Sequence, residues 1–409
     1  MAVSGAPREM ASLLAAASER FNATRHSAAD ETAALAQLIA PLSLREFFET
    51  YWGRRPYAAV EEPAARFAQL FSVRAVDAIL VHGGMGEADA FRIVRSEDGT
   101  ARTLPGSERG PLPMATYYQA YDEGYTIVLN ALHRRWRSIA SLAAQLERAL
   151  LHPIGVNAYF TPPRAQGFAA HADDHDVLIL QIDGAKDWKL REQTQTDATP
   201  TSTTAKLRAG NLLYIPRGVV HEAKTSHERS LHLTVSINVT SWLDLLVDAL
   251  RTSAAQLPEL AAPLGPRFLA ASPGRHANAL RGLLERIDLT PGVEAVFARM
   301  ESTLVRNTDP LPDGHFEAIE AARSLTLDTN LRRRQLAFTR VARTGTTASV
   351  SFDGNHVDGP AFLEPALKFI ATAALFRPRD LPGRLTDAAK LVLCTRMVRE
   401  GLLTIGGVE

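Results

Sequence analysis

The sequence has few of the features that would place a protein in a membrane or outside the cell. It contains a single cysteine, Cys394, among 409 residues, which excludes a disulfide within the chain and a cluster of thiolate metal ligands. No run of about 18 uncharged apolar residues occurs, so we expect no membrane-spanning helix. The N-terminal region also lacks the long apolar segment of a signal peptide. We therefore expect a cytoplasmic protein.

The chain also lacks an excess of either charge. Lys and Arg together number 45, as do Asp and Glu, so the formal net charge is zero. This balance argues against a dedicated nucleic-acid-binding or membrane-surface protein. Hydrophobic residues make up 46% and charged residues 22% of the chain, which is typical of globular domains. The length is enough for two or three such domains.

The periodicity of the apolar residues changes along the chain. Between residues 155 and 239, short segments of strand character are separated by Gly, Pro, Asp and Ser, which predicts an antiparallel sandwich or barrel. Among them, a turn at Asp183-Gly184 separates two predicted strands. After Thr240 the pattern becomes helical, and Thr386 is a predicted N-cap near the C-terminus. The run Arg332–Arg334 is most simply a solvent-exposed face.

One short motif carries a candidate metal site. His171-Ala172-Asp173 places two metal-binding side chains two residues apart, and in a strand such residues point the same way. His221 follows a Pro-Arg-Gly sequence and can supply the third ligand. Two histidines and one carboxylate form the facial triad of non-haem Fe(II) oxygenases, which leaves about three positions of the ion open. The alternative is a solvated loop, because residues 174–176 are also polar.

A candidate cation for an anionic cosubstrate follows the metal motif. Lys186 shares a strand face with Trp188, which favours an inward position over the usual surface position of a lysine. A 2-oxo acid that chelates the metal needs its far carboxylate held by a buried cation. Two rows of polar residues can line the same interior, since alternate residues of a strand share one face. They are Asn157, Tyr159 and Thr161 in one segment and His232, Thr234 and Ser236 in another.

Together these motifs resemble the JmjC-type ribosomal oxygenases of the cupin superfamily. The resemblance extends over nearly the whole chain, including the entry segment Tyr51–Pro56. One departure is Ala172, where relatives often carry an aromatic residue, and the N-terminal extension is unmatched. The matching segments are Asn157–Pro163, Gln166–Phe168, His171–Asp174, Gln181, Trp188, Gly210–Gly218, His221 and Ser230–Thr234.

The resemblance implies an α+β protein built on a double-stranded β-helix, the cupin or JmjC barrel. Residues 1–30 would form a flexible N-terminal extension, and residues 31–240 the JmjC/cupin catalytic domain. Residues 241–340 would form a helical dimerisation region, and residues 341–409 a winged-helix-like domain. The protein would assemble as a homodimer, with the winged helix as a scaffold or as a wall that faces the substrate.

The same resemblance assigns roles to the candidate residues. His171, Asp173 and His221 match the iron ligands, and Lys186 matches the cation that binds 2-oxoglutarate. The implied cofactor is Fe(II), with 2-oxoglutarate and O₂ as cosubstrates. The positions that line the cosubstrate and substrate pocket are Asn157, Tyr159 and Ser236, with Thr234 and His232 on the same strand face as Ser236.

The implied activity is hydroxylation of an amino-acid side chain in a peptide or protein, coupled to decarboxylation of 2-oxoglutarate to succinate and CO₂. Lys186 in place of arginine, together with Thr161-Pro162-Pro163, is closer to the histidine-hydroxylating branch, which favours the β-carbon of a histidine. The substrate would be a ribosomal protein or the precursor of a ribosomally synthesised peptide natural product. The alternatives are a peptidyl-arginine hydroxylase, an N-methyl-lysine demethylase and, from another class, a non-catalytic cupin or interaction protein.

Overall fold

The chain divides into two compact units. The first comprises residues 1–239 and 308–409, and the second comprises residues 240–307. The predicted N-terminal extension lies, over residues 1–27, outside the described residues. The computed structural model describes residues 28–82, 90–106, 112–192, 201–308, 310, 314–334 and 338–406.

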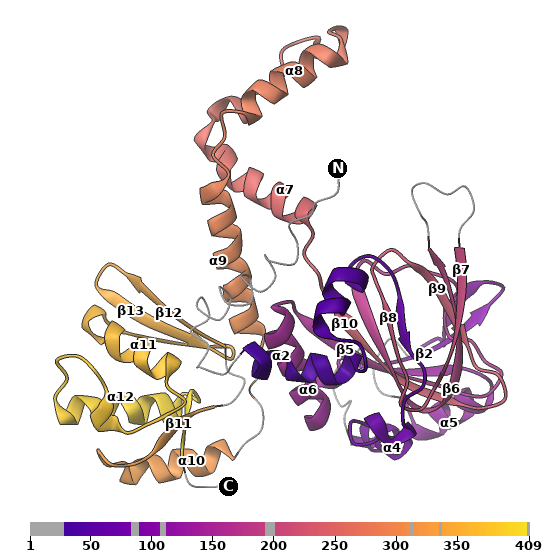
Figure 1. Ribbon diagram of the computed structural model, residues 1–409, viewed down its shortest axis with the longest axis horizontal. Coiled ribbons are helices and arrows are strands. Elements are labelled where there is room, and N and C mark those ends of the chain that lie inside the picture. Colours follow the sequence, from indigo (N-terminus) through magenta and orange to yellow (C-terminus); the bar gives the residue numbers. More distant parts are fainter. Residues whose placement is uncertain are drawn as a thin grey trace. The chain divides into compact units, whose positions relative to one another are not determined.

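A ten-stranded sheet dominates the N-terminal part of the first unit (Figure 1). Eight strands follow the order β1-β8-β6-β10-β5-β4-β2-β3, while β7 and β9 both pair with β6. The first half of β6 pairs antiparallel with β8 and β10, and its second half pairs antiparallel with β7 and β9. The predicted antiparallel β-fold is thereby confirmed. The strands are β1 (Tyr57–Ala59), β2 (Phe91–Glu97), β3 (Thr100–Thr103), β4 (Thr126–Leu129), β5 (Ile154–Thr161), β6 (Asp176–Glu192), β7 (Thr201–Arg208), β8 (Leu212–Ile215), β9 (Val220–Lys224) and β10 (Ser230–Ile237).

Strand β6 is continuous, so the predicted turn at Asp183-Gly184 is wrong. Gly184 has a φ of +65°, and the register of β6 against β10 shifts between Leu231 and His232. Such a bulge bends a strand without ending it. A glycine beside a polar residue is typical of turns and of bulges alike. We therefore predicted a turn where the strand contains a bulge.

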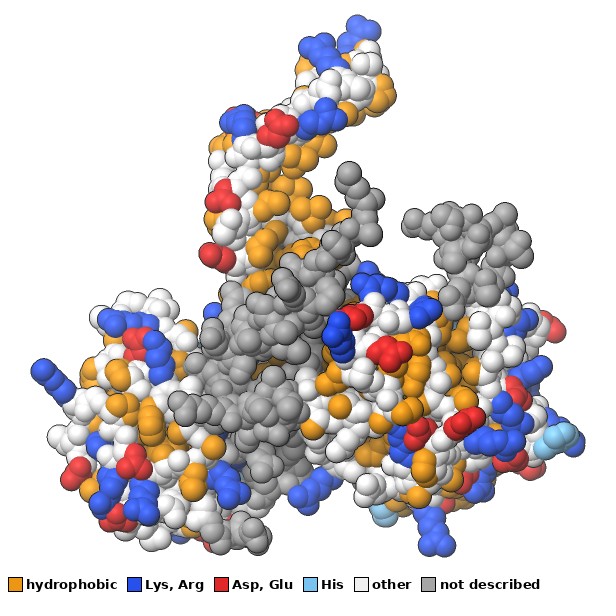
Figure 2. Space-filling model, in the orientation of Figure 1, with side chains coloured by type: hydrophobic (Ala, Val, Ile, Leu, Met, Phe, Trp, Pro, Cys, Tyr) orange, Lys and Arg blue, Asp and Glu red, His pale blue; other side chains and the backbone are white. Residues whose placement is uncertain are grey.

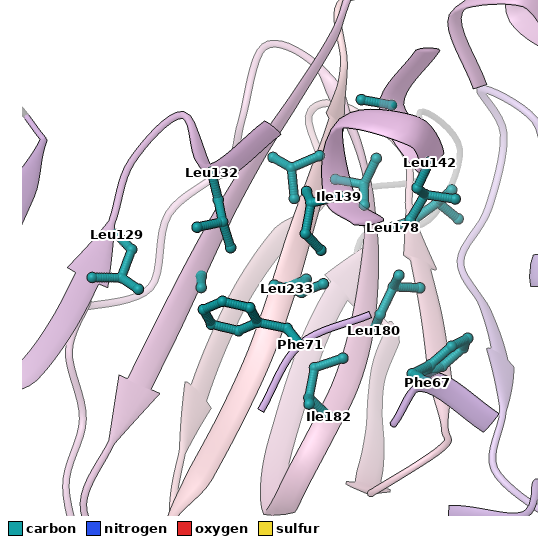
Figure 3. Close-up of a cluster of buried hydrophobic side chains, with 14 of the residues drawn as sticks. Phe67, Phe71, Leu129, Leu132, Ile139, Leu142, Leu178, Leu180, Ile182 and Leu233 are labelled. Atoms are coloured by element: carbon teal, nitrogen blue, oxygen red, sulfur yellow. The ribbon is translucent and has the colours of Figure 1, made fainter. Parts of the chain in front are cut away.

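The two faces of the sheet differ in chemistry. On the outer face, apolar side chains of β5, β6 and β10 pack in one core with the helices, as Figure 3 shows for Leu178, Leu180 and Leu233. All three are fully buried, and each such leucine contributes about 1.5–3 kcal/mol through burial. The residues that alternate with them, such as Ile179 on β6 and His232 and Thr234 on β10, therefore face the interior of the barrel. The helices of this part are α2 (Ala28–Ile39), α3 (Leu44–Glu46), α4 (Val73–His82), α5 (Met114–Asp122) and α6 (Arg137–Leu150).

The C-terminal part of the first unit contains two three-stranded sheets, with the orders β15-β11-β16 and β12-β13-β14. Thr386 caps α12 as predicted, because its side chain accepts a hydrogen bond from the backbone N–H of Ala389. The winged-helix assignment stays a prediction. The elements are α10 (His315–Ala321), β11 (Leu331–Arg333), β12 (Thr339–Thr344), β13 (Thr347–Phe352), β14 (Asn355–Pro360), α11 (Glu364–Thr372), β15 (Leu375–Phe376), α12 (Asp387–Arg399) and β16 (Leu403–Ile405).

The arginine run in this part is only partly the exposed face that we expected, because Arg332 is exposed whereas Arg333 and Arg334 are buried. Arg333 and Arg334 are 7% and 8% exposed. Their guanidinium groups donate hydrogen bonds to the carbonyl oxygens of Ala371 and Gly401. Backbone acceptors of other elements thus stabilise both side chains inside the protein, which a run of like charges in a sequence does not reveal.

The second unit is helical, as the pattern after Thr240 predicted. It contains α7 (Trp242–Ser253), α8 (Pro273–Leu284) and α9 (Thr290–Asn307). Helices α7 and α9 touch closely, because a Cβ on Gly292 would lie 2.3 Å from the carbonyl oxygen of Ala249. Among the described residues of the whole chain, no helix is long and apolar enough to cross a membrane.

Replacing Gly184 with alanine is expected to destabilise the protein by about 3 kcal/mol or more. A positive φ costs alanine about 1–2 kcal/mol, and a Cβ would also lie 1.9 Å from the Arg229 carbonyl oxygen, so the backbone must move. Gly99 is a matched control, with a φ of +76° and nothing within 4 Å of a Cβ. Urea unfolding should show a loss of only about 1–2 kcal/mol for Gly99→Ala. Equal losses in the two variants would contradict the account of the bulge.

Candidate active site

A cavity of about 160 Å³ lies on the inner face of the barrel. The side chains of all nine residues that the sequence analysis proposed for the site line it, together with six others. The proposed residues are His171, Asp173, His221, Lys186, Asn157, Tyr159, His232, Thr234 and Ser236, and the additional ones are Phe168, His175, Val177, Ile179, Trp188 and Ala223.

His171, Asp173 and His221 converge at one end of the cavity. One potential ligand atom from each lies within 4.8 Å of the other two. The Nε2 atoms of His171 and His221 lie 3.7 and 3.6 Å from the two carboxylate oxygens of Asp173. Within the described ranges no other group of three or more His, Cys, Asp or Glu side chains meets in this way. Two imidazole nitrogens and a carboxylate suit a divalent transition metal with open positions.

Hydrogen bonds orient both imidazoles. His171 Nδ1 lies 2.9 Å from the carbonyl oxygen of Ala169, and His221 Nδ1 lies 3.0 Å from that of Val219. An Nδ1–H that donates to a carbonyl leaves Nε2 unprotonated and free to bind a metal. Burial, the largest cause, lowers the pKa of His221, which keeps this imidazole in the neutral form that a metal requires.

The segment that carries the His-x-Asp pair is not the strand that we assumed. Only His171 pairs there, in an isolated antiparallel bridge with His221, while residues 172–173 have no regular structure. The bridge is made by two backbone hydrogen bonds of 3.1 and 2.8 Å, and Gly218 N–H donates to the Asp173 carbonyl oxygen at 2.8 Å. Backbone hydrogen bonds therefore join the segment that carries His171 and Asp173 directly to the segment that carries His221.

Asp176 braces the turn that leads to His221. It is 1% exposed and accepts hydrogen bonds from the hydroxyl of Tyr214 and from the backbone N–H of Arg217, the latter at 2.9 Å. The Tyr214 hydroxyl in turn accepts from the backbone N–H of Gly53 at 2.8 Å. Burial, followed by the Asp176 charge, raises the pKa of Tyr214, so its proton stays available for this bond.

Lys186 is buried in the cavity without a counterion. It is 5% exposed, and its Nζ donates to the hydroxyl of Thr161 at 3.2 Å. Within the described part of the chain no carboxylate forms an ion pair with it. Burial lowers the pKa of Lys186 to about 7, because an ammonium group loses solvation inside the barrel. An anion that entered the cavity would stabilise the charged form.

The two polar rows lie side by side on the paired strands β5 and β10, with His232 opposite Tyr159 and Thr234 opposite Asn157 in the register. The rings of Tyr159 and His232 stack, with centroids 5.0 Å apart and planes inclined by 3°. The side-chain oxygen of Asn157 accepts a hydrogen bond from a backbone N–H at 2.9 Å. Burial, then the neighbouring lysine, lowers the pKa of His232 well below its ordinary value. Among the described residues, the buried atoms His232 Nδ1 and Trp188 Nε1 have no hydrogen-bond partner in the protein, so a polar group in the cavity could bond to them.

Sequence reasoning did not select the apolar wall of the cavity. Val177 and Ile179 line it from the first half of β6, whereas Lys186 and Trp188 line it from the second half. Strict alternation from Val177 would turn Lys186 away from the cavity, since the two positions differ by an odd number. The bulge at Ile182, which has no register partner on β10, reverses the alternation and turns the lysine inward. The alternation of residues within each half of β6 therefore identifies the inward side chains only when the position of the bulge is known.

Comparison with known proteins identifies the region of the chain that contains the candidate site. The JmjC domain family matches residues 131–245, which include every residue proposed for the site. The chain is 30% identical over 215 residues to the bifunctional lysine-specific demethylase and histidyl-hydroxylase NO66 of Drosophila pseudoobscura pseudoobscura, covering 49% of this chain and 22% of that protein. It is 31% identical over 226 residues to ribosomal oxygenase 1 of Gallus gallus, covering 51% of this chain and 37% of that protein. The match thus spans well under half of either relative.

A solved structure resembles nearly the whole chain. It is that of YcfD, a ribosomal oxygenase from Escherichia coli in complex with cobalt and 2-oxoglutarate, with a TM-score of 0.51. The match covers 90% of this chain and 99% of that chain at 20% sequence identity. At this identity the similarity establishes a shared fold.

Replacing Asp176 with asparagine is expected to destabilise the protein by about 1–3 kcal/mol, because an amide offers a single acceptor oxygen to two buried donors. Asp183→Asn is a matched control on the same strand. It removes an ion pair with Arg229 of 2.8 Å between half-exposed side chains, which is worth less than about 1 kcal/mol. Urea unfolding measures both. A loss for Asp176→Asn no larger than that of the control would contradict the bracing role.

Proposed function

We propose that the chain, whose residues 131–245 match the JmjC domain family, is an Fe(II)- and 2-oxoglutarate-dependent oxygenase that hydroxylates an amino-acid side chain in a peptide or protein. One observation carries the proposal: a cluster of two histidines and one carboxylate shares a single cavity with a buried lysine that no described carboxylate pairs with. The cluster can bind the metal, and the lysine can bind the far carboxylate of a 2-oxo acid.

The donor set fits iron. His171, Asp173 and His221 supply two nitrogens and one oxygen from one side, which leaves positions for a bidentate cosubstrate and for O₂. When bound, the iron would supply the oxidation of a substrate C–H bond, coupled to decarboxylation of 2-oxoglutarate to succinate and CO₂. The protein would hold the two histidines in the required tautomer and fix the carboxylate between them.

We expect His171→Ala and His221→Ala each to weaken Co(II) binding by roughly 100-fold or more, since loss of a ligand costs at least as much as loss of its outer-shell support. His227→Ala is a control, because His227 is exposed and does not line the cavity. Isothermal titration calorimetry with Co(II) measures all three variants. If either ligand variant bound one equivalent of Co(II) as tightly as the parent protein, the metal assignment would be wrong.

Lys186 would bind the 5-carboxylate of 2-oxoglutarate. Its Nζ and the hydroxyl of Thr161 lie together at the buried end of the polar row on β5, and a charge-assisted hydrogen bond there is shielded from water. Arg217, a cation in the turn before His221, is exposed and does not line the cavity. The cavity therefore favours Lys186 over Arg217.

Lys186→Ala should weaken 2-oxoglutarate binding by about 2–4 kcal/mol, or roughly 30- to 1,000-fold, and should leave Co(II) affinity nearly unchanged. Lys189→Ala is the matched control, because Lys189 lies on the same strand but is exposed. Titration of the Mn(II)-loaded protein with 2-oxoglutarate measures the effect. An unchanged affinity in Lys186→Ala, or an equal loss in Lys189→Ala, would move the cosubstrate carboxylate elsewhere.

The substrate side chain that we propose is a histidine, oxidised at its β-carbon. Asn157, Tyr159 and Ser236 offer hydrogen-bonding groups on the same face as the metal cluster, and burial raises the pKa of Tyr159, so its hydroxyl stays a donor. A relative is named a histidyl-hydroxylase and a lysine-specific demethylase. One set of peptides can therefore test both hydroxylation and demethylation. Peptides with a central His, Arg or N-methyl-lysine should show gain of one oxygen atom on histidine only. Gain of an oxygen atom on arginine would contradict histidine as the target residue. Loss of a methyl group from N-methyl-lysine would contradict hydroxylation as the reaction.

We propose that the client is a ribosomal protein or a precursor peptide, and that the protein works in the cytoplasm. One relative is named a ribosomal oxygenase, which supports the first client. Cys394 is unpaired and buried, and burial raises the pKa of its thiol to about 12. A thiol held in this inert form needs no disulfide partner, in keeping with a reducing compartment.

The second unit supports a homodimer. Helix α7 packs on α9 where it carries Ala249 and Ser253, while Trp242, Leu243 and Leu246, nearer its N-terminus, are 87%, 67% and 49% exposed. Figure 2 shows that apolar side chains gather on these helices. A surface of this kind is typical of an interface between protein chains, and we propose a second copy of this chain as its partner.

Light scattering at micromolar concentration should therefore give twice the chain's mass of 44.5 kDa. Leu243→Glu should shift the protein towards monomer by placing a charge in the interface. Arg251→Glu on the same helix is the control, since the side chain of Arg251 is 77% exposed and polar. A parent protein that is monomeric, or a control that dissociates as readily as Leu243→Glu, would contradict the proposed dimer.

A further inference from the structure

Arg92 lies on the same face of the sheet as the cavity. The register pairs Arg92 of β2 with Val128 of β4, and Val128 with Tyr159 of β5. Directly paired residues of neighbouring strands point to the same side of a sheet, so Arg92 continues the inner face outward from Tyr159. The two residues are separated by two strand spacings, or about 9.6 Å along the sheet.

The guanidinium group of Arg92 is held over a residue of the cavity wall. Its central carbon lies 5.8 Å from the ring centroid of Phe168. The same ring lies 6.0 Å from the ring of His171 and 5.9 Å from that of Tyr159. The cation is therefore within about 12 Å of a proposed iron ligand, and the stacking fixes its position. Burial raises the pKa of Tyr159 most, and Arg92 acts against that rise, which agrees with this proximity.

Arg92 is an exposed cation that has no anionic partner among the described residues. It forms no ion pair with any described carboxylate, whereas Arg95 on the same strand pairs with Glu97. The carboxylates at the cavity are otherwise engaged: Asp173 belongs to the metal cluster, and Asp174 pairs with His175 at 2.9 Å. The inner face beside the cavity thus presents one fixed positive charge.

We propose that Arg92 recognises a carboxylate side chain of the peptide substrate, close in sequence to the residue that is oxidised. The inference rests on the proposed function and adds a specificity-determining residue to it. A guanidinium group that stacks on an aromatic ring keeps its N–H donors free for a bidentate contact with a carboxylate. Electrostatic complementarity of this kind selects among peptides that all carry the same reactive residue.

The distances restrict where the carboxylate can be. An extended peptide rises about 3.3 Å per residue, so a side chain within about 12 Å of the metal cluster belongs to a residue at most three positions from the oxidised one. A strongly basic peptide with no acidic residue in that window would meet an unfavourable charge at Arg92. The preferred substrates are therefore peptides with Asp or Glu within three residues of the target.

Matched peptides test the proposal directly. Peptides of alanine and glycine with a central histidine would carry a single Asp, Asn or Lys at each of the three positions on either side. With the Fe(II)-loaded protein and 2-oxoglutarate, we expect kcat/KM for the best Asp peptide to exceed that of its Asn analogue about tenfold. Arg92→Gln should abolish this preference and Arg92→Lys should retain most of it. Arg92→Glu should reverse it in favour of the Lys peptide.

Two controls separate this inference from the proposed function. Arg102→Gln, an exposed arginine of β3 whose register partner is Arg95 on the opposite face, should keep the preference for Asp. The peptide-independent decarboxylation of 2-oxoglutarate should not change in the Arg92 variants. If no peptide is oxidised, the affinity of the peptides for the Mn(II)-loaded protein is measured instead. Tighter binding of Asp peptides than of Asn peptides, lost in Arg92→Gln, would support the inference even though the proposed oxygenase activity is not observed. Equal rates or affinities for Asp and Asn peptides, or no binding of any acidic peptide, overturn it.

Discussion

The burial of one ammonium group is the constraint on which the rest of the site depends. Lys186 is enclosed in the barrel with a threonine hydroxyl as its hydrogen-bond partner, and a buried charge without a counterion is costly. The protein accommodates it by lowering the pKa of the lysine to about 7. A dicarboxylate that chelates a metal at His171 and His221 would supply the missing negative charge. The free site therefore stores an unfavourable interaction that its cosubstrate relieves.

Backbone geometry determines which way this lysine points. Before the bulge at Ile182 the odd-numbered residues of β6, such as Val177, face the interior, and after it the even-numbered residues do. The bulge therefore changes which residues enter the cavity without interrupting the strand. A second device acts at the opposite end of the site, where Asp176 holds the turn before His221. The proposed metal ligands and the proposed cosubstrate cation are thus positioned by separate parts of one strand and its neighbours.

Much of the site could be predicted because local patterns determine it. Alternation identified the polar rows of Asn157 and His232, and ligand spacing identified His171, Asp173 and His221, all of which line one cavity. The features that the sequence did not predict depend on contacts between residues that are distant in the sequence. The brace between Asp176 and Tyr214 joins residues 38 positions apart.

The remaining errors have the same origin. The burial of Arg333 depends on a carbonyl 38 positions away, and the register of Arg92 requires three strands to be aligned. No periodicity within a single segment contains that information. The bulge before Gly184 was predicted as a turn for a related reason, since the register shift and the close approach of Gly184 to the backbone of Arg229 both involve another segment. Local patterns predicted which residues matter, and the long-range pairing decided how they are held.

The pH dependence of 2-oxoglutarate affinity tests the central claim most directly. If Lys186 is largely neutral in the free protein and charged in the complex, binding takes up a proton. The dissociation constant of the anaerobic Mn(II)-loaded protein should then rise above pH 7 and approach a tenfold increase per pH unit. Lys186→Arg should remove this dependence, because arginine stays charged. A dissociation constant that is flat between pH 7 and 9 in the parent protein, or equally steep in Lys186→Arg, would contradict the account.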